Sequence, residues 1–559
     1  MKETEELKIA IQGALTQLGI DGGDFSVTAT DDVTHGDFAS NVAFVVASVT
    51  GLTPIEEAKR ILTQIQLPSY IDAATVAKPG YINFSFTREY FLKTITSLRS
   101  DSGAWGTSTS LQGRRILVEY TQPNPFKPFH IGHLMSNTIG ESISRLIENA
   151  GATIKRANYQ GDIGPHVAKT MWALMKRGAS ADDVSVLAAA YVEGTAAYEE
   201  NLEAKQEIDD INKRLYSGEL RESPLYIQGR ETSLARFEEL YAILGTTFDY
   251  YFFETESAPV GREVVTEGLA KKIFEESDGA IVFNGEQYGL HTRVFVTSKG
   301  TPTYETKELG LAVLKRKVFP YDENITITAV EQEQYFKVVT KAMDMVWPIH
   351  AGTYRHISHG MMQLAEGKMS SRKGNVITGE SLIDDMREKA YEKMKERELG
   401  DKKAEIADAV AVAAIKYSIL KQRMGKNIAF DQEASLSFEG NSGPYLQYAH
   451  TRACSVLRKA SAIGLQASYD EVPGVASPLE KELARFPQVI ARALHEYEPH
   501  HLTTYLTRLA ALFNSMYAQE KIAVADDVYA PYRVAVTDAF RITMERGLYL
   551  LGIKSPTEM

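Results

Sequence analysis

The chain of 559 residues has little cysteine, no long apolar run and an excess of acidic side chains. Its one cysteine, Cys454, excludes an intramolecular disulfide and a zinc site built on thiolates, which fits a reducing compartment. The first residues, MKETEELKIAIQ, lack the apolar core of a secretory signal peptide, and no apolar run approaches the length of a membrane span. We therefore expect a cytoplasmic protein that binds no membrane.

The formal net charge of −12 weighs against a nucleic acid as partner, although a large acidic body can still carry a basic face. A composition of 44% hydrophobic and 24% charged residues is typical of soluble globular proteins. The length predicts several domains, each with its own core.

Three parts follow from composition and periodicity. Residues 1–105 begin with apolar residues at helical spacing and continue with short apolar runs and turns, which predicts an α+β domain that ends in a Ser- and Gly-rich linker. Residues 106–385 mix strand and helix signals and predict an α/β domain. Residues 386–559 are dominated by helical periodicity and predict an all-α helical bundle. The apolar positions that support the first and last parts are Leu7, Ile11, Leu15 and Leu18, and Leu502, Tyr505, Leu506, Leu509 and Phe513.

The middle part contains two histidines, His130 and His133, behind the proline-rich loop of VEYTQPNPFKPFHIGH (residues 118–133). RRILVEYT (114–121) predicts a buried strand and TIKRANY (153–159) the next strand. A helix is predicted between them, because Ile131, Leu134, Ile139, Ile143, Leu146 and Ile147 fall on one face. This βαβ unit predicts a parallel sheet of Rossmann type.

The histidines then lie in the first turn of that helix, at the carboxyl end of a strand. Open α/β sheets bind ligands at this edge, and the free N–H groups and dipole of a helix N-terminus favour phosphate. Gly132 lets a nucleotide come close to the backbone.

The run His130-Ile131-Gly132-His133 resembles the HIGH signature of class I aminoacyl-tRNA synthetases, and GKMSSRKGN (367–375) resembles their KMSKS loop. Ser371 stands where that signature has its second lysine. The resemblance implies a catalytic set of His130, His133, Lys127, Lys368 and Lys373, and an ATP site of Gly132, His130, His133, Met361, Lys368, Ser370 and Ser371. Adenylate formation needs positioning and positive charge, which we expect the histidines and the lysine loop to supply. Lys127 or Lys373 could replace the missing lysine.

Nearly the whole chain resembles the arginyl-tRNA synthetase family. The segments that carry the likeness are HGDFASNVAF, GYINF, NYQGDIGPH, GPYLQYAHTR, LFNSMYAQ and LLGIKSPTEM, together with the two signatures. The resemblance implies ATP-dependent ligation of L-arginine to its tRNA through arginyl-adenylate, with activation that requires bound tRNA. It implies tRNA contacts at Tyr81, Asn83, Tyr445, Arg452, Tyr517 and Met559. We expect a monomer and Mg²⁺ that arrives with the phosphates of ATP, without a protein-ligated metal.

Arginine recognition needs carboxylates and amides that receive a planar, permanently charged fork of donors. Glu119 ends the first predicted strand of the βαβ unit, and Tyr304 and Glu308 lie one turn apart on the predicted helix PTYETKELGLAVLKRK (302–317). The family's arginine-binding positions match Glu119, Asn124, Tyr304, Glu308 and Gln332. Glu308 stands where the family commonly has aspartate.

Simpler structural roles stay open for these residues. The histidines can cap a helix, and residues 368–373 can form a solvated turn. Glu119 can form a strand-end salt bridge, and Glu308 a surface pair with Lys307 or Lys315. Tyr81 and Asn83 can be ordinary packing residues, Tyr445, Tyr448 and Tyr517 core aromatics, and Cys454 a small buried hydrophobe.

Two other functions also stay open: another class I synthetase, or a tRNA-binding relative without catalysis. The single cysteine excludes the familiar cysteinyl form, and the chain has no room for the large editing insertion of enzymes for branched aliphatic amino acids. Intact His130, His133, Lys368 and Lys373 weigh against a non-catalytic relative.

Overall fold

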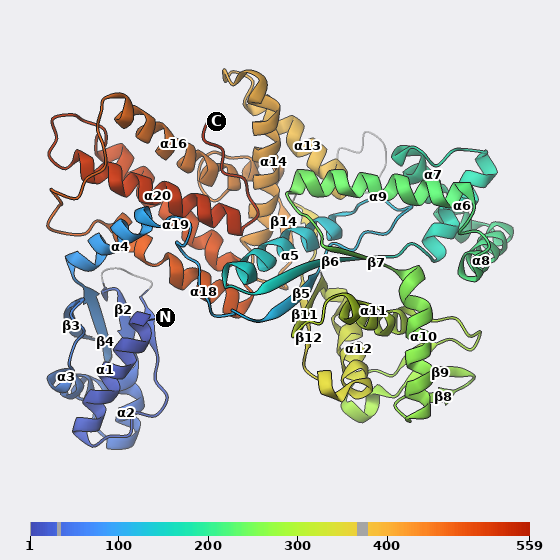
Figure 1. Cartoon of the computed structure of the whole chain (residues 1–559), viewed down its shortest axis with the longest axis horizontal. Helices are drawn as coiled ribbons and strands as arrows, with labels where there is room; N and C mark the ends of the chain where they lie inside the picture. Colours follow the sequence, from blue (N-terminus) through green and yellow to red (C-terminus); the bar gives the residue numbers. More distant parts are fainter. Residues whose placement is uncertain (1, 31–34, 366–377) are drawn as a thin grey trace.

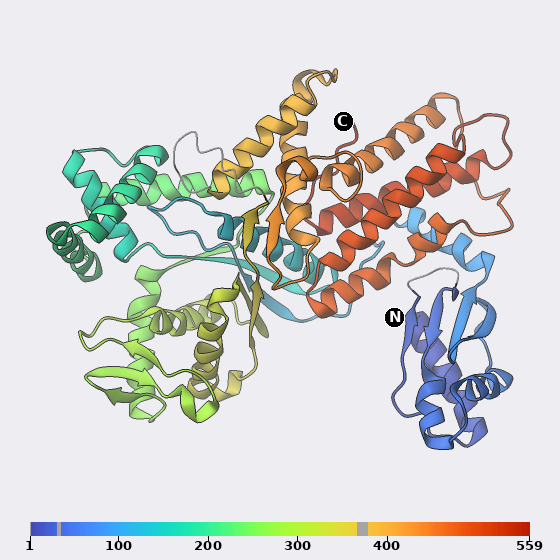
Figure 2. The same ribbon diagram turned by 180° about the vertical axis from the view of Figure 1, so that it is seen from behind.

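The computed structural model describes residues 2–30, 35–365 and 378–559. Figure 1 shows three parts, with the N-terminal part (blue) and the segment α10–α12 (yellow-green) at opposite ends of the molecule, and Figure 2 shows the same arrangement from behind. The predicted fold class is confirmed: an α+β N-terminal part, a parallel-sheet middle part and a helical C-terminal part. None of the helices in the described ranges is long and apolar enough to cross a bilayer.

The N-terminal part packs helices on an antiparallel sheet of order β1-β2-β4-β3. Leu7, Ile11 and Leu15 of the predicted first helix are fully buried in its core, which Ile82 and Phe84 of the sheet complete. Its elements are α1 (Lys2–Leu18), β1 (Val27–Ala29), β2 (Phe38–Ser40), α2 (Val42–Thr50), α3 (Pro54–Gln64), β3 (Ile71–Ala77), β4 (Tyr81–Phe86) and α4 (Arg88–Ser100).

The middle part is built on a five-stranded, all-parallel sheet of order β12-β11-β5-β6-β7. Its main elements are β5 (Arg115–Glu119), α5 (Ile131–Asn149), β6 (Thr153–Gln160), α6 (Pro165–Arg177), α7 (Val184–Glu200), α8 (Leu202–Ser217), α9 (Pro224–Leu244), β7 (Tyr250–Phe253), α10 (Glu254–Ala270), α11 (Tyr304–Val318), β11 (Glu323–Ala329), η3 (Val330–Gln332), α12 (Glu333–Val346) and β12 (Tyr354–His359). A small antiparallel sheet, β8 (Glu275–Ser277), β9 (Ala280–Phe283) and β10 (Arg293–Val296), stands between α10 and α11, with η2 (Gly285–Tyr288) beside it. Ile116, Leu117 and Val118 are fully buried, as expected for a central strand that is covered on both faces.

Helix α5 is buried on nearly all sides, not only on the predicted apolar face. Figure 1 shows α5 between the sheet and the helices of the C-terminal part. Four helices of that part contact α5: α13, α14, α18 and α20. Its polar side therefore finds partners inside the protein: Glu141 pairs with Arg145 and Arg156, and Ser142 Oγ donates to the carbonyl of Leu550 at 2.9 Å. Gly140 has no alternative, because a Cβ there would lie 2.2 Å from the Tyr120 ring.

The C-terminal part is a helical assembly with one short strand that the sequence did not predict. Its elements are α13 (Gly379–Lys393), η5 (Gly400–Lys402), α14 (Lys403–Leu420), β14 (Ile428–Phe430), α15 (Gln432–Ser435), α16 (Gly443–Ala462), α17 (Pro478–Ala484), α18 (Phe486–Glu496), α19 (His500–Gln519) and α20 (Ala530–Leu550). The strand β14 is too short to give a periodic signal, and it forms by pairing in parallel with β13 (Met362–Leu364) from the middle part. The apolar face predicted for α19 is buried throughout.

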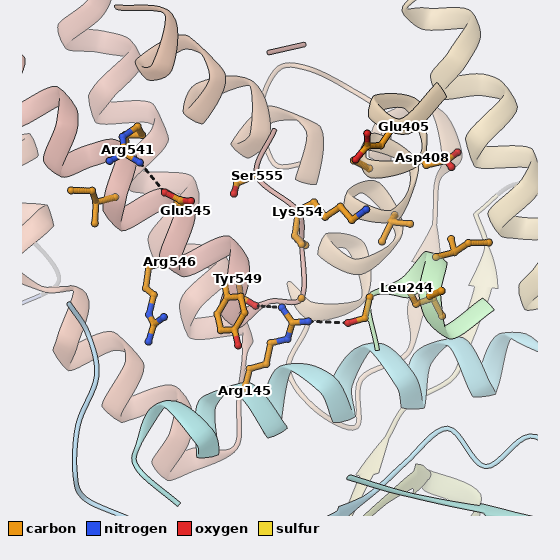
Figure 3. A pocket seen from close by; sticks show the side chains of 18 of the residues that line it. Arg145, Leu244, Glu405, Asp408, Arg541, Glu545, Arg546, Tyr549, Lys554 and Ser555 are labelled. Atoms are coloured by element: carbon orange, nitrogen blue, oxygen red, sulfur yellow. Dashed lines mark hydrogen bonds and ion pairs between the residues drawn. The ribbon is translucent and has the colours of Figure 1, made fainter. Parts of the chain in front are cut away.

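Two cations join the middle and C-terminal parts by bonding to the ends of helices α9 and α20. Lys416 of α14 has no exposed surface, and its Nζ donates to the carbonyl of Leu244 at 2.6 Å and of Gly552 at 2.8 Å. Arg145 of α5 donates to the carbonyls of Gly245 and Tyr549 at 2.9 and 2.8 Å. Carbonyls at helix C-termini lack hydrogen-bond partners in their own helix. Lys416 and Arg145 each donate to carbonyls at the ends of both α9 and α20, and so tie the two helix ends together. Figure 3 shows Arg145 and its two bonds beside a cavity of about 900 Å³.

Replacing Lys416 with alanine should lower the stability of this junction by about 2–4 kcal/mol, because it leaves two buried carbonyls without donors and opens a cavity. The measurement is the midpoint of thermal unfolding. Lys554→Ala is the matched control, because Lys554 is an exposed lysine that lines the cavity beside Arg145. An equal loss in both variants would contradict the assigned role. Burial lowers the pKa of Lys416 to about 7 from 10.5. Between these two pH values the unfolded chain therefore binds more protons than the folded chain. The difference in stability between the wild type and Lys416→Ala should rise with pH across this window.

Candidate active site

The two histidines of the HIGH-like signature form the N-terminal cap of α5, at the carboxyl edge of the parallel sheet. His130 is the N-cap residue, and its N–H donates to Nδ1 of His133 at 3.1 Å. The two rings stack with centroids 3.4 Å apart. A Cβ at Gly132 would lie 3.0 Å from the His130 ring, so glycine allows this stacking. The capping role considered from the sequence is present, and it fixes the His133 tautomer with its proton on Nε2.

Both histidines are neutral near pH 7. Burial, followed by the nearby charge of Lys127, lowers the pKa of His130 to about 4. Burial and the neighbouring His130 and Lys127 hold the pKa of His133 well below its ordinary value. They therefore offer neutral N–H donors, and we expect the positive charge of this site to come from its lysines.

The loop before the histidines has a strained backbone. Thr121, Gln122 and Phe126 have φ values of 78°, 54° and 64°, which side chains other than glycine rarely adopt. The loop is held because the Thr121 N–H donates to Ser136 Oγ of α5 and the Phe126 N–H donates to Ser233 Oγ of α9. It carries Lys127, whose Nζ lies 5.7 Å from the centroid of the Tyr191 ring. Strain of this kind is typical of segments that hold a ligand in a fixed geometry.

The residues that follow the second signature lie beside the first one. Thr378 forms an isolated antiparallel bridge with His130, and the N–H of Gly379 donates to the carbonyl of Phe129 at 2.8 Å. Met361, half-exposed, precedes β13 on the other side of the loop and accepts a bond from Ile428. Lys368, Ser370, Ser371 and Lys373 lie outside the described residues, and their roles stay predictions.

The predicted arginine-binding carboxylates lie near enough for the charge of Glu119 to act on Glu308, but in different environments. Glu119 has no exposed surface and forms an ion pair with Lys315 of α11, while its Oε1 accepts from Gln122 Nε2 at 2.5 Å. The strand-end salt bridge considered from the sequence therefore exists. Glu308 forms no ion pair within the described part of the chain, because Lys307 pairs with Glu254 at 2.6 Å. Burial and then the charge of Glu119 raise the pKa of Glu308 to about 8.

The other predicted arginine-binding residues come from α11, the loop after β5 and the turn η3. Tyr304 begins α11 with 59% of its surface exposed, and the Lys307 ammonium lies 4.8 Å from its ring centroid. Asn124 Oδ1 accepts the N–H of Gly161 at 3.0 Å. Gln332 closes η3, directly after β11, and is exposed. Asn124 and Gln332 follow the carboxyl ends of β5 and β11, neighbouring parallel strands where ligands of such sheets bind, and Tyr304 comes from α11.

Glu254 and Gln122 were not predicted from the sequence, and Lys315 was considered only as a surface partner of Glu308. A Cβ at Gly161 would lie 2.7 Å from Asn124 Oδ1 and 3.2 Å from Glu254 Oε1, so Glu254 stands beside a predicted site residue. A signal for Glu254 was available: it follows the strand YYFF directly, as Glu119 ends its own strand. Lys315 and Gln122 gave no such signal, because their roles depend on contacts across the fold.

The residues predicted to contact tRNA lie in two places, one in the N-terminal part and one in the C-terminal part. Tyr81 is exposed on β4, with its ring 4.9 Å from that of Phe44, while Asn83 is buried in the same strand. In the C-terminal part, the Arg452 guanidinium lies 4.8 Å from the Tyr517 ring centroid and donates to Asn514, which donates to the hydroxyl of Tyr445 at 3.1 Å. Arg452, Tyr517 and Met559 line a cavity of about 600 Å³ together with Arg397, Arg458 and Lys459. The whole lining has five basic residues, since it also includes Lys521, and two acidic ones, Glu520 and Glu558.

No group of three or more His, Cys, Asp or Glu side chains that could hold a metal ion occurs in residues 2–30, 35–365 or 378–559. The buried Cys454 lies 3.8 Å from the His450 ring, in helix α16.

The parallel sheet and the histidine cap at its carboxyl edge define a class I aminoacyl-tRNA synthetase. Residues 94–432 match the family model "tRNA synthetases class I (R), catalytic domain". Residues 5–86 match "Arginyl tRNA synthetase N terminal domain" and residues 446–559 match "DALR anticodon binding domain". The chain belongs to the arginyl-tRNA synthetase family.

Whole-chain relatives agree with the family models. The chain is 30% identical over 564 residues to the arginine–tRNA ligase of Treponema pallidum subsp. pallidum, over 97% of this chain and 96% of that protein. It is 31% identical over 562 residues to the arginine–tRNA ligase of Lactobacillus delbrueckii subsp. bulgaricus, over 98% of both. The structure of Thermus thermophilus arginyl-tRNA synthetase superposes with a TM-score of 0.83 at 25% identity, over 100% of each chain. The resemblance drawn from the sequence, and the enzyme class that it implied, are confirmed.

Proposed function

We propose that this arginine–tRNA ligase forms arginyl-adenylate in the crevice at the carboxyl edge of the sheet and then passes the arginyl group to its tRNA. The observation that carries the proposal is the position of His130 at the N-terminus of α5, where it bridges to Thr378, three residues after the second signature. A phosphate at the N-terminus of α5 would meet neutral histidine donors there and the positive end of the helix dipole.

In the first step the arginine carboxylate attacks the α-phosphate of ATP, and pyrophosphate leaves. His130 and His133 donate hydrogen bonds to the phosphate oxygens on which charge develops. Lys127, Lys368 and Lys373 supply the positive charge that the histidines lack, with Ser370, Ser371 and Met361 beside the nucleotide. In the second step a ribose hydroxyl at the end of the tRNA attacks the carbonyl of the adenylate, and AMP leaves.

Arginine is received by Asn124, Tyr304, Glu308 and Gln332, with Glu119 behind them. Glu308 is the carboxylate without a counterion in the described part of the chain, so it is the strongest acceptor for a guanidinium. A planar fork of donors distinguishes arginine from lysine, whose ammonium is a single point charge. Citrulline has the same shape but no charge, and would leave the carboxylates without a cation.

The tRNA lies along the helical part and reaches the N-terminal part. Tyr81 and Asn83 mark the contact with the elbow, and Tyr445, Arg452, Tyr517 and Met559 the contact with the anticodon. The basic lining of the cavity around Arg452 suits a phosphate backbone and aromatic stacking, despite the acidic charge of the whole chain. Mg²⁺ enters with the phosphates of ATP as part of the substrate. The enzyme acts in the cytoplasm as a monomer.

ATP–pyrophosphate exchange tests the proposal. Exchange should depend on arginine and be absent with lysine or citrulline, and the assay is run with and without tRNA. Exchange that is supported equally by another amino acid would overturn the substrate assignment. Bound tRNA without any exchange would indicate a non-catalytic relative.

Removing residues 1–86 should leave a folded enzyme with an unchanged KM for ATP and a raised KM for tRNA. The cut falls before α4, because Arg88 pairs with Glu480, Arg99 pairs with Asp538, and Ile95 and Leu98 belong to the core shared with the helical part. The predicted boundary at residue 105 lies beyond this helix. Charging kinetics that stay unchanged after the truncation would contradict the elbow contact.

A further inference from the structure

Lys127, in the loop before the histidine cap, is a cation without a carboxylate partner. In the part of the chain that the structure describes it forms no ion pair, although Asp183 and Glu380 line the same cavity of about 830 Å³. Its charge acts on the cap: burial is the main cause of the lowered pKa of His130 and of His133, and Lys127 lowers both pKa values further. An unpaired cation at this place is available to the phosphates of ATP.

An aromatic ring holds Lys127 where a carboxylate could have done so. The Nζ of Lys127 lies 5.7 Å from the centroid of the Tyr191 ring, within the range of a cation–π contact. The face of the ring attracts a cation through its quadrupole, so the ammonium keeps its full positive charge. A carboxylate at the same place would hold the ammonium more strongly but would cancel that charge. The contact therefore restrains Lys127 and leaves its charge to act on a ligand.

Tyr191 and the loop that carries Lys127 are held by the same helices. Helix α7, which carries Tyr191, packs against α6 and α9. The Thr170 hydroxyl of α6 donates to the carbonyl of Phe126 at 3.0 Å, and the Phe126 N–H donates to Ser233 Oγ of α9 at 3.0 Å. The ring and the backbone next to Lys127 are therefore fixed relative to each other, and only the flexible side chain of the lysine remains to be placed.

We propose that Tyr191 is a positioning residue for adenylate formation, whose ring holds the Lys127 ammonium beside the histidine cap and away from the acidic side chains of the cavity. The proposal rests on the proposed function, which gives Lys127 a part in neutralising the phosphates. Without the ring, the lysine side chain would explore more rotamers or pair with a carboxylate such as Glu380. Fewer molecules would then present the cation to the leaving pyrophosphate. Tyr191 acts through Lys127 and touches no reacting atom.

The test replaces Tyr191 in the full-length enzyme and measures the rate of adenylate formation with saturating arginine, ATP and tRNA. Tyr191→Leu should lower this rate about 3–10-fold, the value of one cation–π contact. Tyr191→Phe should keep the wild-type rate, because the ring remains. Tyr191→Glu should lose more than Tyr191→Gln, which has the same size, because only the carboxylate cancels the charge of Lys127. The dissociation constant for arginine should stay unchanged in all four variants.

Tyr198→Leu is the matched control for the loss of a ring from α7. Tyr198 is also half-buried, and the Lys169 Nζ lies 4.7 Å from its ring centroid, but Lys169 does not belong to the predicted catalytic set. This variant should keep the wild-type rate. An equal loss in Tyr198→Leu and Tyr191→Leu would overturn the proposal, as would a Tyr191→Glu enzyme that is no slower than Tyr191→Gln.

Lys127→Met separates a failure of this inference from a failure of the proposed function. If Tyr191 acts through Lys127, adding Tyr191→Leu to Lys127→Met should cause no further loss of rate. Losses that multiply would show that Tyr191 supports only the fold, and a slow Lys127→Met enzyme beside a normal Tyr191→Leu enzyme would refute the inference alone. A Lys127→Met enzyme with the wild-type rate would instead refute the part that the proposed function gives to Lys127.

Discussion

Replacing Glu308 with glutamine should raise the KM for arginine on the order of 100-fold, because it removes one partner of a buried charge pair worth about 2–5 kcal/mol. The KM for ATP should change little, since the histidine cap that meets the phosphates belongs to α5 and not to α11. Citrulline should lose much less affinity than arginine in this variant. The neutral amide side chain that replaces Glu308 needs no cation as its partner, so a neutral ligand leaves no charge unpaired. The preference of the enzyme for arginine over citrulline should therefore become smaller.

The pH dependence gives a second measurement on the same residue. The pKa of Glu308 is raised to about 8, while the substrate guanidinium keeps its proton at all working pH values. Below its raised pKa, Glu308 holds a proton that arginine must displace, so the dissociation constant should fall as the pH rises and level off once Glu308 is ionised. Glu308→Gln should show no such slope.

Glu308→Asp is the matched variant, because it keeps the charge and shortens the side chain. If α11 is placed for glutamate, aspartate should lose affinity but keep the pH slope. Wild-type behaviour of both variants would show that the guanidinium is read elsewhere, and a flat wild-type profile would contradict the assignment of the titrating group.

The histidine site could be predicted from the sequence because its determinants are local. A buried strand, a proline-rich loop and apolar residues at helical spacing place His130 and His133 at the start of α5 whatever surrounds them. Their charge could not be predicted, since it depends on burial by distant segments. The fully buried polar side of α5 was missed for the same reason: its partner Leu550 lies more than 400 residues away in the chain.

For the arginine-binding residues too, the sequence predicts some features and only the fold determines others. Glu119 and Glu308 could be named from the ends of predicted elements and from family likeness. The sequence could not show which lysine neutralises which carboxylate, because Lys307 and Lys315 are both plausible neighbours of Glu308 along α11. The fold instead directs Lys307 to Glu254 and Lys315 to Glu119. Sequence spacing gives the candidates, and the packing of β5 and α10 against the helix selects the pairs.

Removing the Nε2–H donor of His133 should slow adenylate formation by about 10²–10³-fold, the loss typical of a donor aimed at charge that develops in the transition state. His133→Asn is the variant of choice. Its side-chain oxygen can still accept the N–H of His130, as Nδ1 does now at 3.1 Å, so the helix cap survives. Binding of arginine and of ATP should change little, because the interaction strengthens only as the phosphorus gains charge.

His133→Gln is the complementary variant, because its amide can reach the Nε2 position but not the cap. It should keep more of the rate and lose more thermal stability than His133→Asn. Equal losses of rate and of substrate affinity in His133→Asn would show that the side chain only shapes the pocket.

Neutral histidines also predict the pH profile of the chemical step. At saturating arginine and ATP, the rate of adenylate formation should show no histidine titration between pH 6 and 8, since the pKa of His130 is about 4 and that of His133 is also far below the ordinary 6.5. The arginine-dependent rise caused by Glu308 disappears under these conditions, because the substrate is bound. An inflection near pH 6.5 that is lost in His130→Asn or His133→Asn would mean that a protonated imidazole takes part. The charge on the phosphates would then be met by the histidines themselves, and Lys127 and the lysine loop would no longer be required as its main source.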